Sequence, residues 1–126
     1  MKQHILVVDD EAPVRNLLTT YFEKRGYRVT AAAGAEEARR CADEVPPSLM
    51  ILDIDLSDAD GLELLAAFRK AYPRLPIIML TGMGYDDELL QEALQKGASG
   101  YVSKTLPLDQ LLMEVHRALN HQAPVA

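Results

Sequence analysis

The sequence predicts an α/β fold: a doubly wound (βα)5 sandwich in which a five-stranded parallel sheet, in strand order 2-1-3-4-5, carries helices on both faces. Short apolar runs alternate five times with amphipathic helical patterns along the 126 residues. The runs are apolar at consecutive positions, which is typical of parallel strands buried on both faces. A chain of this length builds one hydrophobic core, so the whole pattern describes a single domain.

The first half of the chain contains two strand–helix units. The apolar run 5–8 predicts the first strand, and the apolar stripe from 14 to 22 predicts the helix that follows it. The run 28–31 predicts the second strand, and the stripe from 38 to 45 predicts the second helix. Gly26 follows two cations and is expected to end the first helix, because glycine accepts a positive φ and cations suit the negative end of the helix dipole.

The second half repeats the unit three times. Strands are predicted at 49–52, 77–80 and 100–102, and helices over the stripes 64–72, 89–94 and 108–119. Gly97, which follows a lysine, is expected to end the fourth helix in the same way as the glycine of the first unit. We expect the domain to cover residues 1–119, with 120–126 as a C-terminal tail or the start of a linker.

The composition excludes several classes of protein. Hydrophobic residues make up 48% and charged residues 25% of the chain, the balance of a globular domain and not of a disordered one. The formal charge of -6 argues against direct nucleic-acid binding, which needs clustered positive charge. The longest apolar runs contain about four residues, whereas a membrane-spanning helix needs about 20. With no signal peptide and one cysteine, the chain is expected to be cytoplasmic, without membrane insertion.

Acidic residues follow two strands that this topology makes neighbours. Asp9 and Asp10 come directly after the first strand, and Asp53 directly after the third. Three carboxylates at one edge repel one another by up to about 4 kcal/mol per pair at 4 Å, with an effective dielectric constant of about 20. A cation is therefore expected there, and hard oxygen ligands favour Mg²⁺. The later acids Asp58 and Asp60 are interpreted as solvated loop residues.

The fourth and fifth strands end in groups that can hold a phosphoryl group. Thr81 and Gly82 end the fourth strand, and Ser103 and Lys104 follow the fifth. A hydroxyl, a glycine that lets a ligand approach the backbone and an ammonium beside Mg²⁺ suit phosphoryl oxygens. The sequence contains no glycine-rich phosphate loop, so a phosphoryl group bound covalently to a carboxylate is favoured over a bound nucleotide.

These motifs together resemble one family, the CheY-like receiver domain of two-component response regulators. The resemblance covers roughly residues 4 to 119. It depends on five segments in order: Val-Val-Asp-Asp-Glu at 7–11, Leu-Asp-Ile-Asp-Leu at 52–56, Asp-Gly at 60–61, Ile-Ile-Met-Leu-Thr-Gly at 77–82 and Gly-Ala-Ser-Gly-Tyr-Val-Ser-Lys at 97–104.

The resemblance implies a role for each acidic residue at this edge. Asp53 would be the phosphoacceptor and, with Asp10, would bind Mg²⁺ directly, whereas Asp9 would act through water. The main-chain carbonyl of Asp55 would supply a further ligand. The side chains of Asp55 and Met83, which stand two residues after the phosphoacceptor and two after the strand-end threonine, would tune dephosphorylation.

The resemblance also implies a switch and its partners. Lys104 and Thr81 would bind phosphoryl oxygens that come from a sensor histidine kinase or a phosphotransfer protein. Thr81 would then move inward and let Tyr101 turn from exposed to buried, which changes the face of the fourth helix, fifth strand and fifth helix. The partner of that face would be a downstream effector, a fused output domain or a second copy in a phosphorylation-linked dimer. Tyr101 is interpreted equally well as an aromatic residue on a half-buried edge strand.

Two positions depart from the family pattern. Ser57 stands where proline is usual, which is expected to loosen the loop without touching a ligand. Thr105 stands where most members have a proline after a cis bond, and a cis bond before a non-proline residue costs about 2.5–4 kcal/mol. We therefore predict a trans Lys104–Thr105 bond, with Lys104 slightly displaced and weaker retention of the phosphoryl group.

Two other functions have some support in the sequence. Asp53-Ile54-Asp55 also resembles the D-x-D motif of Mg²⁺-dependent phosphohydrolases, but that motif normally ends the first strand of its domain and the chain has no cap insertion. A degenerate receiver that acts only as a binding module is disfavoured by the intact acids, threonine and lysine. The preferred prediction is a signalling switch that is no enzyme beyond its own phosphorylation and autodephosphorylation.

Overall fold

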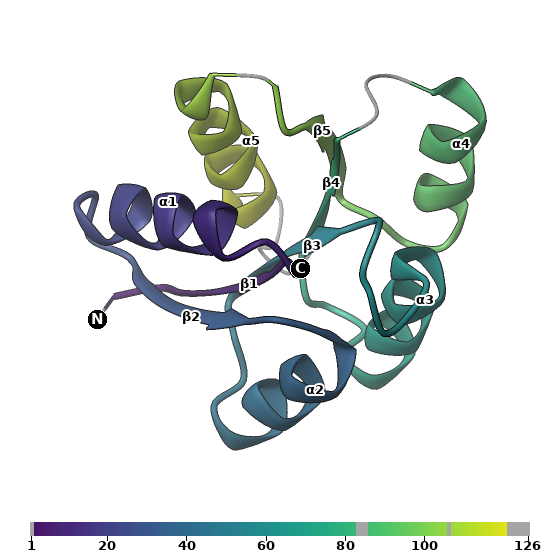
Figure 1. Ribbon diagram of the computed structural model, residues 1–126, viewed down its shortest axis with the longest axis horizontal. Helices are drawn as coiled ribbons and strands as arrows, with labels where there is room; N and C mark the ends of the chain where they lie inside the picture. The colour runs from purple at the N-terminus through teal and green to yellow at the C-terminus, as the bar shows by residue number, and fades with distance from the viewer. Residues whose placement is uncertain (1, 83–85, 106, 121–126) are drawn as a thin grey trace.

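The computed structural model describes residues 2–82, 86–105 and 107–120. In these ranges strands and helices alternate, as Figure 1 shows. The elements are β1 (His4–Val8), α1 (Ala12–Glu23), β2 (Arg28–Ala32), α2 (Ala35–Glu44), β3 (Leu49–Asp53), α3 (Gly61–Ala71), β4 (Ile77–Thr81), α4 (Asp87–Gln95), β5 (Gly100–Ser103) and α5 (Leu108–Asn120). No helix in the described ranges is long and apolar enough to cross a membrane.

The strands form one parallel sheet in the order β2-β1-β3-β4-β5, which confirms the predicted fold class. Val8 at the end of β1 pairs with Ala32 of β2 on one side and with Leu52 of β3 on the other. Leu52 pairs in turn with Met79 of β4. This register aligns the carboxyl ends of the strands at one edge of the sheet, where chemistry in such folds is usually located.

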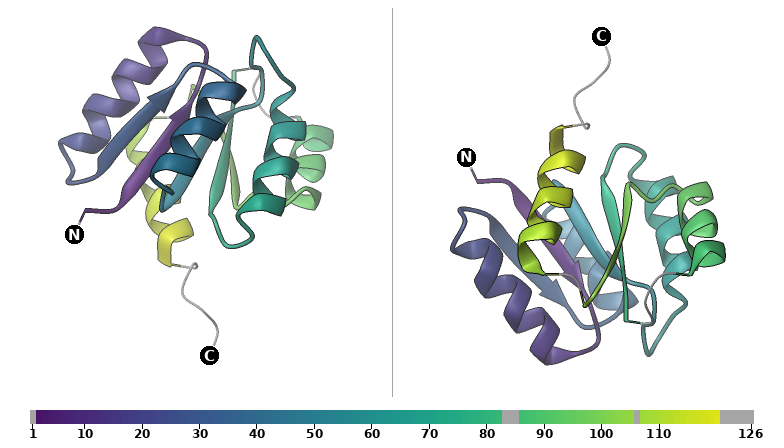
Figure 2. Two further views of the ribbon diagram at one scale, coloured as in Figure 1. Left: turned by 90° about the horizontal axis from the view of Figure 1, so that it is seen from below. Right: turned by 90° about the horizontal axis from the view of Figure 1, so that it is seen from above.

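Two hydrophobic cores lie on opposite faces of the sheet. Ile5 and Val7 of β1 belong to the core beneath α1 and α5, whereas Leu6 and Val8 belong to the core beneath α2, α3 and α4. Figure 2 shows the two helical layers on either side of the sheet. Successive strand residues point to opposite faces, so a strand that feeds two cores must be apolar at every position. This requirement explains the uninterrupted apolar runs.

Two glycines end helices as predicted, but two leucines predicted to lie on buried apolar stripes are exposed. Gly26 and Gly97 have φ angles of +91° and +105°, the left-handed conformation expected at helix ends. Leu17 and Leu94, assigned to apolar stripes, are 54% and 46% exposed, because each lies at the border of its stripe and turns toward solvent. The last helix, α5, ends at Asn120, and residues 121–126 lie outside the described ranges.

Candidate functional site

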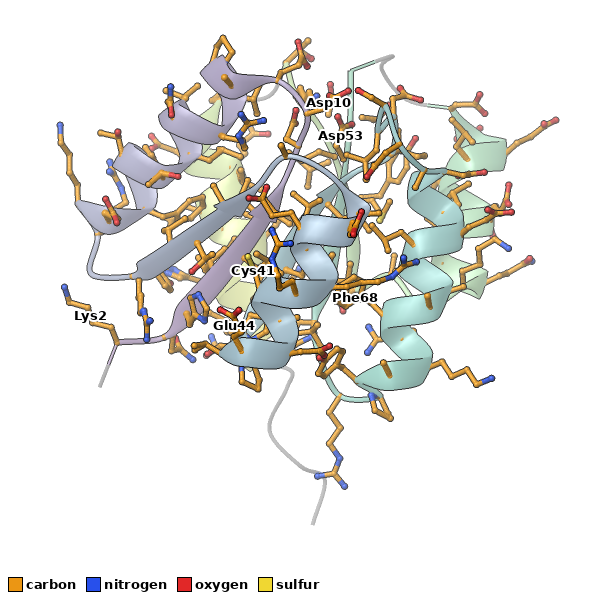
Figure 3. The ribbon with its side chains drawn as sticks, turned by 60° about the horizontal axis from the view of Figure 1, so that its bottom comes forward. Lys2, Asp10, Cys41, Glu44, Asp53 and Phe68 are labelled. Carbon is orange, nitrogen blue, oxygen red and sulfur yellow. The ribbon has the colours of Figure 1, made fainter. Side chains whose placement is uncertain are left out.

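The carboxyl ends of β1 and β3 bring four carboxylates together. Asp9, Asp10 and Glu11 follow β1, and Asp53 is the last residue of β3. A carboxylate oxygen from each of the four lies within 4.8 Å of those of the others. Asp10 and Asp53 lie side by side at this edge in Figure 3. The structure thus brings together the three aspartates that sequence reasoning placed at one site, and it adds Glu11.

Lys104 extends from the end of β5 into this acidic cluster. Its Nζ lies 2.9 Å from Oδ2 of Asp9, 2.8 Å from Oε1 of Glu11 and 3.0 Å from Oδ2 of Asp53. The backbone N–H of Lys104 donates to the carbonyl of Thr81 at 2.8 Å, which anchors the residue to the end of β4. The Lys104–Thr105 bond is trans, as predicted, and no peptide bond between described residues is cis. One ammonium therefore offsets the repulsion among three carboxylates.

Burial and hydrogen bonding have opposite effects on the pKa of Asp53, and also on the pKa of Lys104. Burial raises the pKa of Asp53 above its ordinary value, against hydrogen bonds from the backbone N–H of Asp55 at 3.1 Å and from Lys104. Burial lowers the pKa of Lys104, but its hydrogen bonds with Glu11, Asp9 and Asp53 outweigh that effect, and the net shift is upward. Lys104 therefore stays a cation at neutral pH, while Asp53 is less strongly acidic than a solvated aspartate.

Replacing Lys104 with methionine should lower the free energy of unfolding by about 2–3 kcal/mol at pH 7. Loss of one partner of a buried ion pair costs about 3–5 kcal/mol, and the Lys104 side chain is 16% exposed, so we expect a smaller value. The raised pKa makes the stabilisation by Lys104 fully present below pH ~10.4, and it is lost as the pH rises through the folded-state value. Urea unfolding at pH 7 measures the difference.

Lys96→Met is the matched control for that measurement. Lys96 forms an i,i+4 pair with Glu92 at 3.7 Å on the surface of α4. Exposed pairs of this kind contribute about 0.5 kcal/mol or less. Equal losses in the Lys96 and Lys104 variants would contradict a buried network around Lys104.

The loop between β3 and α3 contacts the acidic cluster through Ser57. The Ser57 hydroxyl donates to Oδ2 of Asp10 at 2.5 Å. The expectation that Ser57 touches no ligand candidate is therefore wrong, because the loop folds back over the end of β1. Asp58 and Asp60 are exposed as expected, yet both make structural hydrogen bonds. Asp58 accepts from the backbone N–H of Ala35 at 3.1 Å, and Asp60 caps α3 by accepting from the second N–H of the helix at 2.9 Å.

The two residues assigned to switching are Thr81, the last residue of β4, and Tyr101, the second residue of β5. Thr81 is fully buried and pairs across the sheet with Ser103, one residue before Lys104. Tyr101 is 7% exposed and belongs to the core beneath α4, together with Ala93. A half-buried position of Tyr101 is therefore not observed: its ring is inside. Met83, assigned to dephosphorylation, lies outside the described residues.

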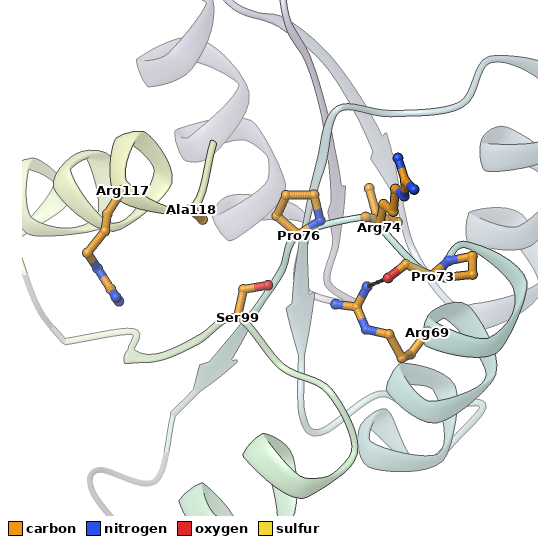
Figure 4. Close-up of a pocket in the computed structure, with 8 residues that line it drawn as sticks. Arg69, Pro73, Arg74, Pro76, Ser99, Arg117 and Ala118 are labelled. Carbon is orange, nitrogen blue, oxygen red and sulfur yellow. Dashed lines mark hydrogen bonds between the residues drawn. The ribbon is translucent and has the colours of Figure 1, made fainter. Parts of the chain in front are cut away.

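A basic pocket at the opposite end of the sheet is separate from this site. It has a volume of about 280 Å³ and is lined in part by Arg69 of α3, by Pro76, just before β4, and by Ser99, just before β5 (Figure 4). Arg69 donates to the carbonyl of Gly97 from Nη2 at 2.7 Å and to that of Pro73 from Nη1 at 3.0 Å. The guanidinium of Arg69 thus donates its hydrogen bonds to backbone carbonyls and has a structural role. The acidic edge remains the candidate functional site.

An α/β sandwich of this strand order, with a lysine inside an acidic cluster at the carboxyl ends of its strands, has the arrangement of a CheY-like domain. The family model described as response regulator receiver domain matches residues 5–116. The chain belongs to this family, which confirms the resemblance found in the sequence.

Curated relatives and solved structures agree with this assignment. A putative response regulator described as NtrX-like, from Rickettsia felis, is 36% identical over 116 residues, which are 90% of this chain and 24% of the relative. A receiver domain protein described as CheY-like, from Methanospirillum hungatei, is 31% identical with a TM-score of 0.91, and the match covers 97% of each chain. NtrX from Brucella abortus is 34% identical with a TM-score of 0.91, covering 97% of this chain and 28% of that one. The chain thus spans about a quarter of the longer relatives.

Proposed function

We propose that this protein is a phosphorylation-dependent switch that accepts a phosphoryl group on Asp53. The observation that supports this function best is the position of the Lys104 ammonium, which contacts Asp53 at 3.0 Å inside a cluster of four carboxylates. The phosphoryl donor would be a sensor histidine kinase or a phosphotransfer protein. A cytoplasmic location and a domain covering 1–119 stay predictions.

The acidic cluster fits a divalent cation. Carboxylate oxygens within 4.8 Å of one another are the hard donors that Mg²⁺ prefers. Asp10 and Asp53 would bind the ion directly and Asp9 through water, with the main-chain carbonyl of Asp55 as a further ligand. Bound Mg²⁺ would supply positive charge to the oxygens of the transferring phosphoryl group.

The residues of the chain would divide the phosphoryl transfer among them. A carboxylate oxygen of Asp53 attacks phosphorus in line, the new O–P bond forms and the N–P bond of the phosphohistidine breaks, and the imidazole leaves with its electron pair. Lys104 needs little movement to pair with a phosphoryl oxygen, since its Nζ already contacts the nucleophile. Thr81, buried at the end of the neighbouring strand, would donate its hydroxyl to another oxygen.

The output of the switch would depend on the same two strands. Binding of Thr81 to the phosphoryl group would favour one of two pre-existing arrangements of α4, β5 and α5. The buried Tyr101 ring supports a model in which its inward position is already accessible before phosphorylation. The affected face would contact an effector, a fused output domain or a second copy. Asp55 and Met83 would set the rate at which water removes the phosphoryl group.

Incubation with acetyl phosphate and Mg²⁺, followed by intact-mass measurement, tests this function. We expect the mass of one added phosphoryl group, which disappears with time and is absent when Mg²⁺ is removed by a chelator. Steady turnover of phosphomonoesters would instead indicate a phosphohydrolase. No mass gain and no turnover would indicate a module that only binds, and would contradict the proposal.

A further inference from the structure

We propose that Ser57 is a positioning residue that orients Asp10 for the divalent cation. This inference depends on the proposed function, because it concerns the same acidic cluster. Asp10 is one of the four carboxylates that converge, and its Oδ2 accepts the hydrogen bond from the Ser57 hydroxyl at 2.5 Å. A hydroxyl that donates to a carboxylate oxygen forms a charge-assisted bond, which is stronger than a bond between two neutral groups.

Of the four clustered carboxylates, Ser57 contacts Asp10, which is not among the ion-pair partners of Lys104. Within the described residues, the ion pairs of Lys104 go to Asp9, Glu11 and Asp53. Asp10 lies among these same acids but outside the reach of their shared ammonium. The hydroxyl of Ser57 therefore supplies the donor that fixes the Asp10 rotamer, at an end of β1 where like charges would otherwise push the side chain toward solvent.

The loop that carries Ser57 is fixed without the proline that is usual there. An isolated antiparallel bridge joins Asp55 to Asp60 and closes the loop on itself. The Gly61 N–H donates at 3.1 Å to the carbonyl of Ile54, the residue that follows β3, and joins the two ends of the loop to each other. A hydroxyl on a loop whose ends are joined in this way can hold its acceptor in one direction, as the partners of metal-binding carboxylates do.

The hydrogen bond leaves Asp10 directed into the site. In the structure the bond to Ser57 and the convergence of Asp10 with the other carboxylates occur together. Ser57 thus supports the arrangement that a cation needs and does not draw Asp10 away from it. Loss of such a supporting donor typically lowers metal affinity by about 10–100-fold.

Calorimetric titration with Mg²⁺ alone, without a phosphoryl donor, tests the inference. Ser57→Ala should bind Mg²⁺ about 10-fold more weakly than the wild type. Ser57→Thr keeps the hydroxyl and should restore most of the affinity. In an Asp10→Asn background, Ser57→Ala should add little further loss, because its effect acts through Asp10. Ser57 is exposed, so unfolding midpoints of these variants should stay close to that of the wild type.

Two other results would overturn the inference in distinguishable ways. If Asp10→Asn weakens Mg²⁺ binding while Ser57→Ala binds as tightly as the wild type or more tightly, Ser57 does not position Asp10, and the proposed function stands. If Asp10→Asn itself binds Mg²⁺ like the wild type, the acidic cluster is not the cation site, and both proposals fail.

Discussion

Asp53→Asn should gain no phosphoryl group from acetyl phosphate and should be more stable than the wild type at pH 7. The amide cannot act as the nucleophile, so intact mass should stay unchanged. The amide also removes a buried charge that is only partly compensated, and we expect about 1–3 kcal/mol of additional stability in Mg²⁺-free buffer. Chemical unfolding in the presence of a chelator measures this gain.

The pH dependence of that gain follows from the raised pKa of Asp53. Well below pH ~4 the carboxyl is protonated in both folded and unfolded protein, and the two proteins should be equally stable. As the pH rises, the unfolded wild type loses its proton first, so the wild type loses stability relative to Asp53→Asn until the folded-state pKa is passed. A gap that grows toward low pH would contradict this account.

Asp87→Asn is the control for the mass measurement. Asp87 is exposed in the first turn of α4 and lies outside the acidic cluster. This variant should gain the phosphoryl group as the wild type does. A phosphoryl group on Asp53→Asn would show that another residue accepts it.

Gly61→Ala should destabilise the protein and reduce phosphorylation together. A Cβ at Gly61 would lie 2.6 Å from the main-chain oxygens of Asp53 and Ile54 and from the Ile54 Cα. These are backbone atoms that cannot rotate away, so the end of β3 has to shift. Overpacking of this kind costs about 1–3 kcal/mol, although alanine in place of glycine would otherwise favour the helix by about 1 kcal/mol. Urea unfolding and the rate of phosphoryl incorporation are the two measurements.

Gly100→Ala provides the comparison. A Cβ at Gly100 meets Ile78 Cγ1 and Glu114 Oε1 at 3.6 Å, which is an ordinary contact distance. We expect less than about 1 kcal/mol of destabilisation and phosphorylation close to that of the wild type. If Gly61→Ala is as mild as Gly100→Ala, the close approach of α3 to the end of β3 is not what requires glycine at position 61.

The fold could be predicted because it depends on local patterns of apolar residues. Each strand lies between two cores and must be continuously apolar, and each helix covers one core and shows one stripe. The acids after the first and third strands were placed together by topology alone, since parallel strands in this order share one edge. Lys104 was placed beside these acids because the fifth strand ends at the same edge of the sheet.

The details of the site could not be predicted because they depend on loop paths. Ser57 and Asp10 are 47 residues apart, and no periodicity relates a loop hydroxyl to a carboxylate on another strand. Glu11 was missed as a partner of Lys104, since its side chain is 60% exposed and follows two more obvious acids. The position of Glu11 beside Asp9 and Asp10 was the available signal.

Arg69 has a consequence for how α4 can move. Its guanidinium ties the carbonyl of Gly97, just beyond α4, to that of Pro73, just beyond α3. Because these bonds reach main-chain atoms at the end of α4 remote from Asp53, any displacement of the helix that preserves them is a swing about its last turn. Displacement of α4 is then largest at its first turn, which begins at Asp87 and lies toward the acidic edge, and smallest at the end that Arg69 holds.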